Sequence, residues 1–173
     1  FLELGGKDPA IVLEGADLDR ATTAILRASI AATGQACQSL ERLYVAQSEY
    51  DKFIQLLTDK AQAAELTKDN PKKGIVGPLI FARQAEIIQQ HLDDALRKGA
   101  IVYCGGSIED DNGAKWIAPT VLGNVDHTMD IMTEETFGPI MPVMPFDNPA
   151  QAVALANDSS YGLSAAISAE DED

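Results

Sequence analysis

The chain has 173 residues, of which 46% are hydrophobic, enough to bury the core of one domain. Its 27 acidic residues exceed its 13 basic ones and give a formal net charge of −14, which argues against nucleic acid and anionic membranes as partners. No apolar run approaches the length of about 20 residues that a membrane-spanning helix needs, so we expect a cytoplasmic protein with no membrane segment.

The two ends of the chain do not look like the ends of a natural protein. The first residue is Phe1 instead of a methionine, and an ordered-looking motif begins at once. The last five residues, AEDED, form a charged run without a helix stop signal. We therefore expect these residues to be an excised piece of a longer protein.

Hydrophobic spacing in the N-terminal half predicts strands that alternate with helices. The apolar run PAIVL, residues 9–13, predicts a buried strand, and the next segment predicts a helix with Asp17 as its N-cap and Gly34 just beyond its C-cap. RLYVA, residues 42–46, predicts a second strand, and Ser48 is expected to cap a second helix. The face of that helix expected to be buried carries Phe53, Ile54, Leu57 and Ala61.

The C-terminal half continues the same alternation. A helix predicted at about 82–98 leads into a strand at 100–104, and the pair Asn112-Gly113 predicts a hairpin turn before a strand at 116–122. The residues of this helix expected to face inward are Ile87, Ile88, Leu92, Ala95 and Leu96. The remaining predicted elements are a strand at 140–146, a helix at 149–156 and a strand at 163–168. This order predicts an α/β fold with a largely parallel sheet.

Cys37 lies in the stretch GQACQSLER, residues 34–42, just beyond the first predicted helix. A lone cysteine is more often a small core residue than a nucleophile, and Cys104, at the end of a strand, fits that interpretation. Cys37 lies in a turn, where its side chain can face a cleft. His91 and His127 give no sequence support for a Cys–His pair or a metal site, and both thiols are expected to be reduced.

Two other stretches carry candidate chemistry. In LELGGK, residues 2–7, Glu3 lies between two leucines, and burial there would raise the pKa of its carboxyl and make it a general base near neutral pH. The alternative is a terminal residue with its side chain in water. The two glycines that follow allow a close approach of the backbone to another group. The stretch EETFGPI, residues 134–140, is by itself only a loop.

Four motifs together point to a family: LELGGK at 2–7, GQAC at 34–37, EETFGP at 134–139 and NDSSYGLSA at 157–165. In this order and with these gaps, the chain resembles the aldehyde dehydrogenase superfamily over nearly its whole length. The resemblance implies a three-layer α/β catalytic domain over residues 1–173, without the nucleotide-binding domain and the oligomerisation segment of the family.

The resemblance also implies the roles of individual residues. Cys37 matches the nucleophile that attacks the aldehyde carbon to give a thiohemiacetal, and Glu3 matches the general base that activates water to hydrolyse the later thioester. Glu135 matches the carboxylate that holds the ribose hydroxyls of NAD or NADP, and Phe137 matches the aromatic residue packed near that ribose. Leu4 matches the residue whose backbone carbonyl meets the nicotinamide amide.

The implied parent protein is an NAD(P)-dependent aldehyde dehydrogenase that forms homo-oligomers and acts on a small-molecule aldehyde. A carboxylate at Glu3 favours water over coenzyme A as the acyl acceptor, so the expected product is a carboxylic acid. The isolated fragment is expected to be inactive, because the surfaces that bind the cofactor phosphates and part of the oxyanion hole belong to the missing domain. The alternative is a non-catalytic folded module, either a pseudoenzyme or an inactive truncation.

Overall fold

The computed structural model describes residues 4–68 and 72–170. Within these ranges, one sheet has the strand order β3-β6-β7-β2-β1-β8, and all neighbouring strands are parallel except β3 and β6. The strands of this sheet are β1 (Asp8–Val12), β2 (Leu40–Ala46), β3 (Ile101–Cys104), β6 (Thr120–Gly123), β7 (Ile140–Phe146) and β8 (Ala166–Ser168). The largely parallel sheet predicted from the sequence is therefore confirmed.

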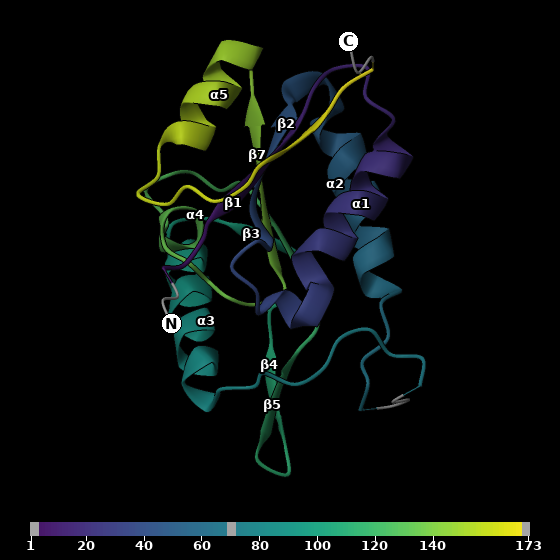
Figure 1. Ribbon diagram of the computed structural model, residues 1–173, viewed down its shortest axis with the longest axis vertical. Helices are drawn as coiled ribbons and strands as arrows, with labels where there is room; N and C mark the ends of the chain where they lie inside the picture. The colour runs from purple at the N-terminus through teal and green to yellow at the C-terminus, as the bar shows by residue number, and fades with distance from the viewer. Residues whose placement is uncertain (1–3, 69–71, 171–173) are drawn as a thin grey trace.

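Helices cover both faces of the sheet (Figure 1). They are α1 (Leu18–Ile30), α2 (Tyr50–Gln62), α3 (Ala82–Arg97), α4 (Asp130–Thr133) and α5 (Pro149–Asn157). Figure 1 shows α1 and α2 on one side of the sheet and α3, α4 and α5 on the other. The hairpin formed by β4 (Ile108–Asp111) and β5 (Ala114–Ile117) extends beyond these layers. The hairpin turn predicted at Asn112-Gly113 is confirmed, and both residues are left-handed.

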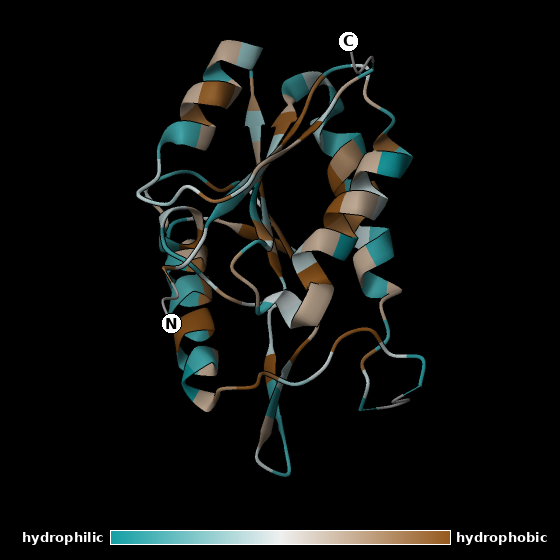
Figure 2. Ribbon diagram, in the orientation of Figure 1, coloured by the Kyte–Doolittle hydropathy of each residue, from teal (hydrophilic) through white to brown (hydrophobic). Residues whose placement is uncertain are grey.

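The core has two parts because successive side chains of a strand point to opposite faces of the sheet. In β2, Leu43 and Val45 pack in the cluster that contains α1 and α2, whereas Tyr44 and Ala46 pack in the cluster that contains α3. Figure 2 shows hydrophobic residues on the helix surfaces that face the sheet. The three-layer α/β architecture is therefore confirmed.

The first helix ends earlier than predicted. Asp17 is its N-cap, as expected, and its side chain accepts a hydrogen bond from the Arg20 N–H at 3.1 Å. However, α1 ends at Ile30, followed by a 3₁₀ turn at Ala31–Gly34 that contains left-handed residues. The predicted position of Gly34 just beyond the C-cap was therefore wrong, although Gly34 is left-handed at φ +68°, as predicted. The helix stops earlier because contacts with distant residues, such as the hydrogen bond from the Gly77 N–H to the Thr33 hydroxyl, fix this turn.

Three further details differ from the predictions. Ser48 lies in a 3₁₀ turn at Gln47–Glu49, and α2 begins after this turn with no side-chain cap, so Ser48 does not cap the helix. Leu96 is 48% exposed, because it lies about 80° around the helix from the buried Ile88. The strand predicted at 116–122 is two strands, β5 and β6, separated by a break that contains a proline without an N–H to donate.

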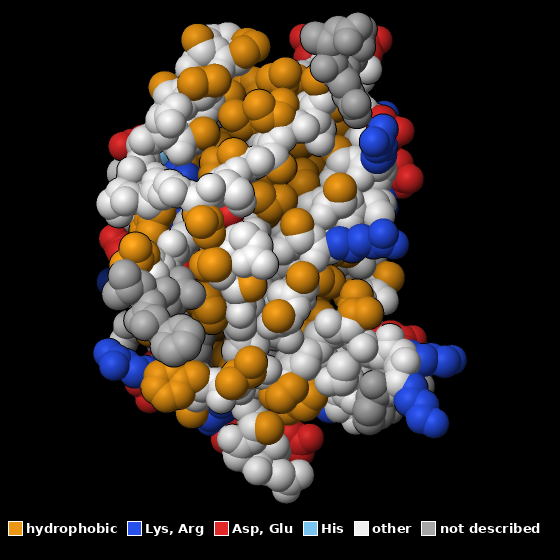
Figure 3. Space-filling view, in the orientation of Figure 1, with side chains coloured by type: hydrophobic (Ala, Val, Ile, Leu, Met, Phe, Trp, Pro, Cys, Tyr) orange, Lys and Arg blue, Asp and Glu red, His pale blue; other side chains and the backbone are white. Residues whose placement is uncertain are grey.

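The C-terminal strand β8 lies at an edge of the sheet, beside β1. Ile167 on this strand is 66% exposed, and Val153 on α5 is 53% exposed. Figure 3 shows apolar side chains gathered on this face of the molecule, along the path of the C-terminal segment. An edge strand with apolar surroundings is a site where another strand can pair. In the described part of the chain, no helix is long and apolar enough to cross a membrane.

Candidate active site

The segments that precede β1, β2 and β7 meet at one end of the sheet, because these neighbouring parallel strands all begin there. We call it the N-terminal end of these strands. Four of the predicted site residues lie on these segments: Leu4 before β1, Cys37 before β2, and Glu135 and Phe137 before β7. Glu3, the predicted general base, lies outside the described residues. The fold therefore gathers segments that are as far apart in the sequence as Gly6 and Glu135, which are separated by 129 positions.

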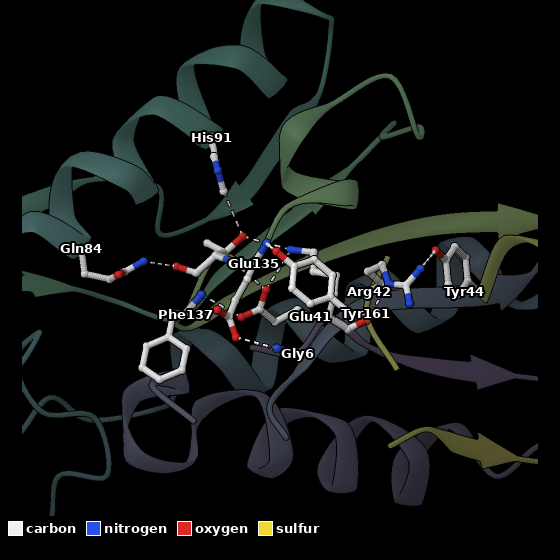
Figure 4. A network of polar contacts seen from close by, with 11 residues as sticks. Gly6, Glu41, Arg42, Tyr44, Gln84, His91, Glu135, Phe137 and Tyr161 are labelled. Atoms are coloured by element: carbon white, nitrogen blue, oxygen red, sulfur yellow. Dashed lines mark hydrogen bonds and ion pairs between the residues drawn. The ribbon is translucent and has the colours of Figure 1, made fainter. Parts of the chain in front are cut away.

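Gly6 connects two of these segments to each other. Its N–H donates a hydrogen bond to Oε1 of Glu135 at 2.7 Å (Figure 4). A Cβ atom at this position would lie only 2.0 Å from the backbone oxygen of Cys37. Any side chain here would therefore collide with the turn at residues 35–39, which we call the cysteine turn. The close backbone approach that the two glycines of LELGGK predicted is confirmed.

Cys37 is half-buried in the turn before β2 and is not part of a disulfide. Its Sγ donates a hydrogen bond to Oε1 of Gln38 at 3.3 Å. Cys104 is also half-buried, but its thiol faces the Pro119 carbonyl at 3.6 Å, and burial raises the pKa of this thiol. Of the two cysteines, Cys37 is the one at the junction of the three segments.

Gln35 holds the cysteine turn in place through its side-chain hydrogen bonds. Its side-chain N–H group donates to the carbonyl oxygens of Ala32 at 3.2 Å and Pro78 at 3.3 Å. Its Oε1 accepts from the Ile80 N–H at 2.7 Å. The glutamine of the GQAC motif thus ties this turn to the 77–80 segment, which gives it a structural role that the sequence did not reveal.

The segment that carries Glu135 and Phe137 has an unusual backbone conformation. Phe137 has φ +51°, in the left-handed region that residues with a side chain rarely adopt. Its N–H donates to Oε1 of Glu41 at 2.7 Å, and the Thr136 N–H donates to Oε2 of Glu41 at 2.8 Å. One buried carboxylate therefore holds two consecutive backbone amides of this segment.

Lys7 and Glu41 form a buried ion pair beneath the site, and sequence reasoning did not identify either residue. Nζ of Lys7 lies 2.8 Å from Oε2 of Glu41 and donates to Oγ1 of Thr136 at 3.1 Å. Burial lowers the pKa of Lys7, and the neighbouring Glu41 carboxylate opposes that change. The signal that could have found the pair is the sequence Glu41-Arg42 at the start of a buried strand, where charges require partners.

Helix α3 contributes two more contacts to the same segment. The Gln84 side chain donates to the Thr136 carbonyl at 2.6 Å, and Nδ1 of His91 lies 3.2 Å from Oγ1 of Thr136. Burial lowers the pKa of His91, and the Lys7 cation acts in the same direction. His127 lies 2.9 Å from the hydroxyl of Tyr44, so both histidines take part in contacts within the fold.

The fourth motif, NDSSYGLSA, packs against the same N-terminal end of the strands. The Tyr161 hydroxyl accepts a hydrogen bond of 3.5 Å from the Glu135 N–H, and a Cβ at Gly5 would lie 3.1 Å from the Tyr161 ring. The Ser164 N–H donates to Asp8 at the start of β1, at 3.1 Å. All four motifs therefore converge on one region. Across residues 4–68 and 72–170, no group of three or more His, Cys, Asp or Glu is arranged to hold a metal ion.

The model of the aldehyde dehydrogenase family matches residues 1–173. The chain belongs to this family. It is 42% identical over 167 residues to lactaldehyde dehydrogenase of Escherichia coli strain K12, a match that covers 96% of this chain and 35% of that protein.

Solved structures of aldehyde dehydrogenases have the same fold. The PutA structure from Anabaena variabilis superposes with a TM-score of 0.96 at 54% identity, over 99% of this chain and 36% of that one. Betaine aldehyde dehydrogenase from Staphylococcus aureus, in complex with NAD⁺, superposes with a TM-score of 0.91 at 35% identity, over 98% of this chain and 34% of that one. The chain thus spans about one third of the length of the relatives it matches.

Proposed function

We propose that this chain is the catalytic domain of an NAD(P)-dependent aldehyde dehydrogenase that oxidises an aldehyde to a carboxylic acid. The observation that supports this function best is that Cys37, Gly6 and Glu135 meet at the N-terminal end of β1, β2 and β7. A thiolate suits the reaction because it is both a good nucleophile and a good leaving group. We call the protein that carries this chain and a nucleotide-binding domain the whole enzyme.

Cys37 performs the covalent chemistry in this proposal. Its thiolate attacks the carbonyl carbon, and the new carbon–sulfur bond places the carbonyl electron pair on oxygen, which gives the oxyanion of a thiohemiacetal. The cofactor, when bound, supplies the acceptor for the hydride that leaves this carbon. The carbonyl re-forms as a thioester, water attacks it with Glu3 as the base, and the thiolate leaves as the acid is released. Backbone N–H groups near the thiol stabilise the oxyanion.

The residues beside Cys37 suit the ribose of a nicotinamide cofactor. Glu135 is half-buried and oriented by the Gly6 N–H, and its carboxylate oxygens can accept hydrogen bonds from sugar hydroxyls. Phe137 is also half-buried, and its ring is proposed to pack near the ribose, while the Leu4 carbonyl is proposed to meet the nicotinamide amide. The bound NAD⁺ in the Staphylococcus aureus relative supports a dinucleotide as cofactor.

The whole enzyme is proposed to be a cytoplasmic homo-oligomer in which the β8 edge pairs with a strand of another subunit. The exposed edge of β8 and its apolar surroundings support this arrangement. The substrate is proposed to be a small aldehyde. Lactaldehyde and betaine aldehyde, the substrates in the names of two relatives, are the first compounds to test.

A polypeptide limited to these 173 residues is expected to bind NAD⁺ with a Kd above about 1 mM. In the proposed enzyme, Glu135 and Phe137 hold only the ribose next to nicotinamide, and the phosphates and adenosine bind the other domain. Each 1.4 kcal/mol of lost contact weakens binding about tenfold. Titration calorimetry of the polypeptide with NAD⁺ measures this, and micromolar binding would contradict the proposed division between domains.

In the whole enzyme, Glu3→Gln is expected to slow steady-state oxidation of lactaldehyde or betaine aldehyde while preserving a rapid first burst of NAD(P)H. The reason is that a base for hydrolysis acts after the hydride has left. Stopped-flow absorbance at the wavelength of the reduced cofactor separates the burst from the later turnover. Loss of the burst with normal cofactor binding would show that Glu3 instead activates the thiol.

Glu14→Gln is the matched control for this experiment. Glu14 is an exposed carboxylate at the opposite end of β1, so both phases should remain unchanged. If the unsubstituted whole enzyme oxidises neither aldehyde with either cofactor, and no other aldehyde in a wider panel reacts, the non-catalytic module becomes the better interpretation.

A further inference from the structure

We propose that Glu41 is a positioning residue for the cofactor: its carboxylate holds the 135–137 segment in the conformation that presents Glu135 and Phe137 to the ribose. This inference rests on the proposed function and adds a residue to it. Glu41 itself lies beneath the segment, is 2% exposed, and is expected to act only through the residues that it holds.

The carboxylate of Glu41 is fully engaged from two directions. It accepts hydrogen bonds from the N–H groups of Thr136 and Phe137, and it pairs with the buried ammonium group of Lys7 at 2.8 Å. A buried carboxylate is stable only with such partners. Because Lys7 belongs to LELGGK and the two amides belong to EETFGP, Glu41 connects the segments that precede β1 and β7.

The segment that Glu41 holds would not adopt its conformation without support. Phe137 is left-handed at φ +51°, which is unfavourable for a residue with a side chain and persists only where surrounding contacts enforce it. The bond from the Phe137 N–H to Glu41 acts on this strained residue directly. Figure 4 shows the Phe137 ring directed away from the network while its backbone amide points into it.

Thr136, between the two proposed cofactor contacts, is anchored through every polar group it has. Its N–H donates to Glu41, its carbonyl accepts from Gln84 at 2.6 Å, and its hydroxyl contacts Lys7 at 3.1 Å and His91 at 3.2 Å. Helix α3, strand β2 and the segment before β1 thus fix one residue. The residues on either side of it are thereby fixed as well.

The test is Glu41→Gln in the whole enzyme, with NAD⁺ and NADP⁺ as probes. Glutamine keeps one acceptor oxygen but turns an NH₂ group toward a backbone N–H and leaves Lys7 without its counter-charge. We expect the affinity for the preferred cofactor, measured by calorimetry, to fall about tenfold, and the KM for that cofactor to rise similarly. The rate at which iodoacetamide alkylates Cys37 without cofactor should stay within about twofold, because the cysteine turn has its own contacts.

Asp94→Asn is the matched control. Asp94 is likewise a buried carboxylate held by a lysine, Lys98 at 2.8 Å, and by a backbone N–H, that of Asp130 at 3.0 Å. However, it belongs to α3 and connects this helix to α4. This variant should unfold at a lower temperature and bind the cofactor within about twofold of the unsubstituted enzyme. If Glu41→Gln also loses only thermal stability and keeps its cofactor affinity, Glu41 is merely structural and the inference is overturned.

A second variant covers the case in which Glu41→Gln does not fold. Gln84→Leu removes a half-buried contact to the Thr136 carbonyl and leaves the ion pair intact. It should weaken cofactor binding about threefold, and unchanged binding in this variant would overturn the inference. An unsubstituted whole enzyme that binds neither NAD⁺ nor NADP⁺ would overturn the proposed function itself, and the inference with it.

Discussion

Replacing Cys37 by serine in the whole enzyme is expected to lower kcat/KM for aldehyde oxidation by about a thousandfold or more. A neutral hydroxyl is a much weaker nucleophile than a thiolate, and an alkoxide is a worse leaving group, so both covalent steps suffer. The measurement is steady-state NAD(P)H production with lactaldehyde and betaine aldehyde. Cofactor binding, followed separately by calorimetry, should change little because the substitution preserves the size of the side chain.

Cys104→Ser is the control that separates the two thiols. Cys104 lies on β3, where its thiol faces a backbone carbonyl, and burial keeps the pKa of the thiol high, which disfavours the thiolate. This variant should keep most of the activity. If Cys37→Ser retained substantial activity while Cys104→Ser lost it, the nucleophile would have been assigned to the wrong cysteine.

Two features of the site that the residues themselves predicted depend on local chemistry, whereas the cofactor roles of Leu4, Glu135 and Phe137 came only from the family resemblance. A cysteine after a glycine and a glutamine predicted a turn at Cys37, and the structure confirms it. The pair Gly5-Gly6 predicted a close approach of the backbone, and Gly6 lies against the cysteine turn. In each case the residue type and its immediate neighbours carry the information, so no knowledge of the remaining fold was needed.

The ion pair beneath the site could not be found in the same way. Glu41 contacts residues that lie 34 and 95 positions away in the sequence, and these contacts exist only once β1, β2 and β7 are neighbours. The second strand was predicted at 42–46, which left Glu41 outside it, although β2 begins at Leu40. A charged residue inside a buried strand was the available signal, but it does not reveal its partners.

The end of the first helix was predicted wrongly for a related reason. The turn after α1 contains Thr33, whose hydroxyl accepts from the Gly77 N–H at 2.8 Å, and Gly34, where a Cβ would lie 2.3 Å from the Gly138 oxygen. These distant partners favour left-handed conformations at Ala32 and Thr33, where helical spacing alone predicted further helix, whereas the left-handed Gly34 was predicted. The departure matters for function, because the same turn leads directly to Cys37 and shapes its surroundings.

Gly6→Ala in the whole enzyme is expected to lower kcat/KM by about a hundredfold or more. The added Cβ would lie 2.0 Å from the backbone oxygen of Cys37, so one of the two backbone segments must move by more than 1 Å. Displacement of a reacting group by about 1 Å can cost about a hundredfold in rate. The same movement would break the hydrogen bond from the Gly6 N–H to Glu135, so the affinity for the cofactor should fall as well.

Gly162→Ala tests whether this effect depends on the collision. Gly162 lies in the fourth motif, NDSSYGLSA, but a Cβ there would have no neighbour within 4 Å. The activity and cofactor affinity of the Gly162→Ala variant should therefore be nearly unchanged. Both variants are compared by steady-state kinetics, by calorimetry with NAD⁺ or NADP⁺, and by thermal unfolding, which identifies any loss due to unfolding. A folded Gly6→Ala enzyme with full activity would show that the contact between Gly6 and the cysteine turn does not shape the active site.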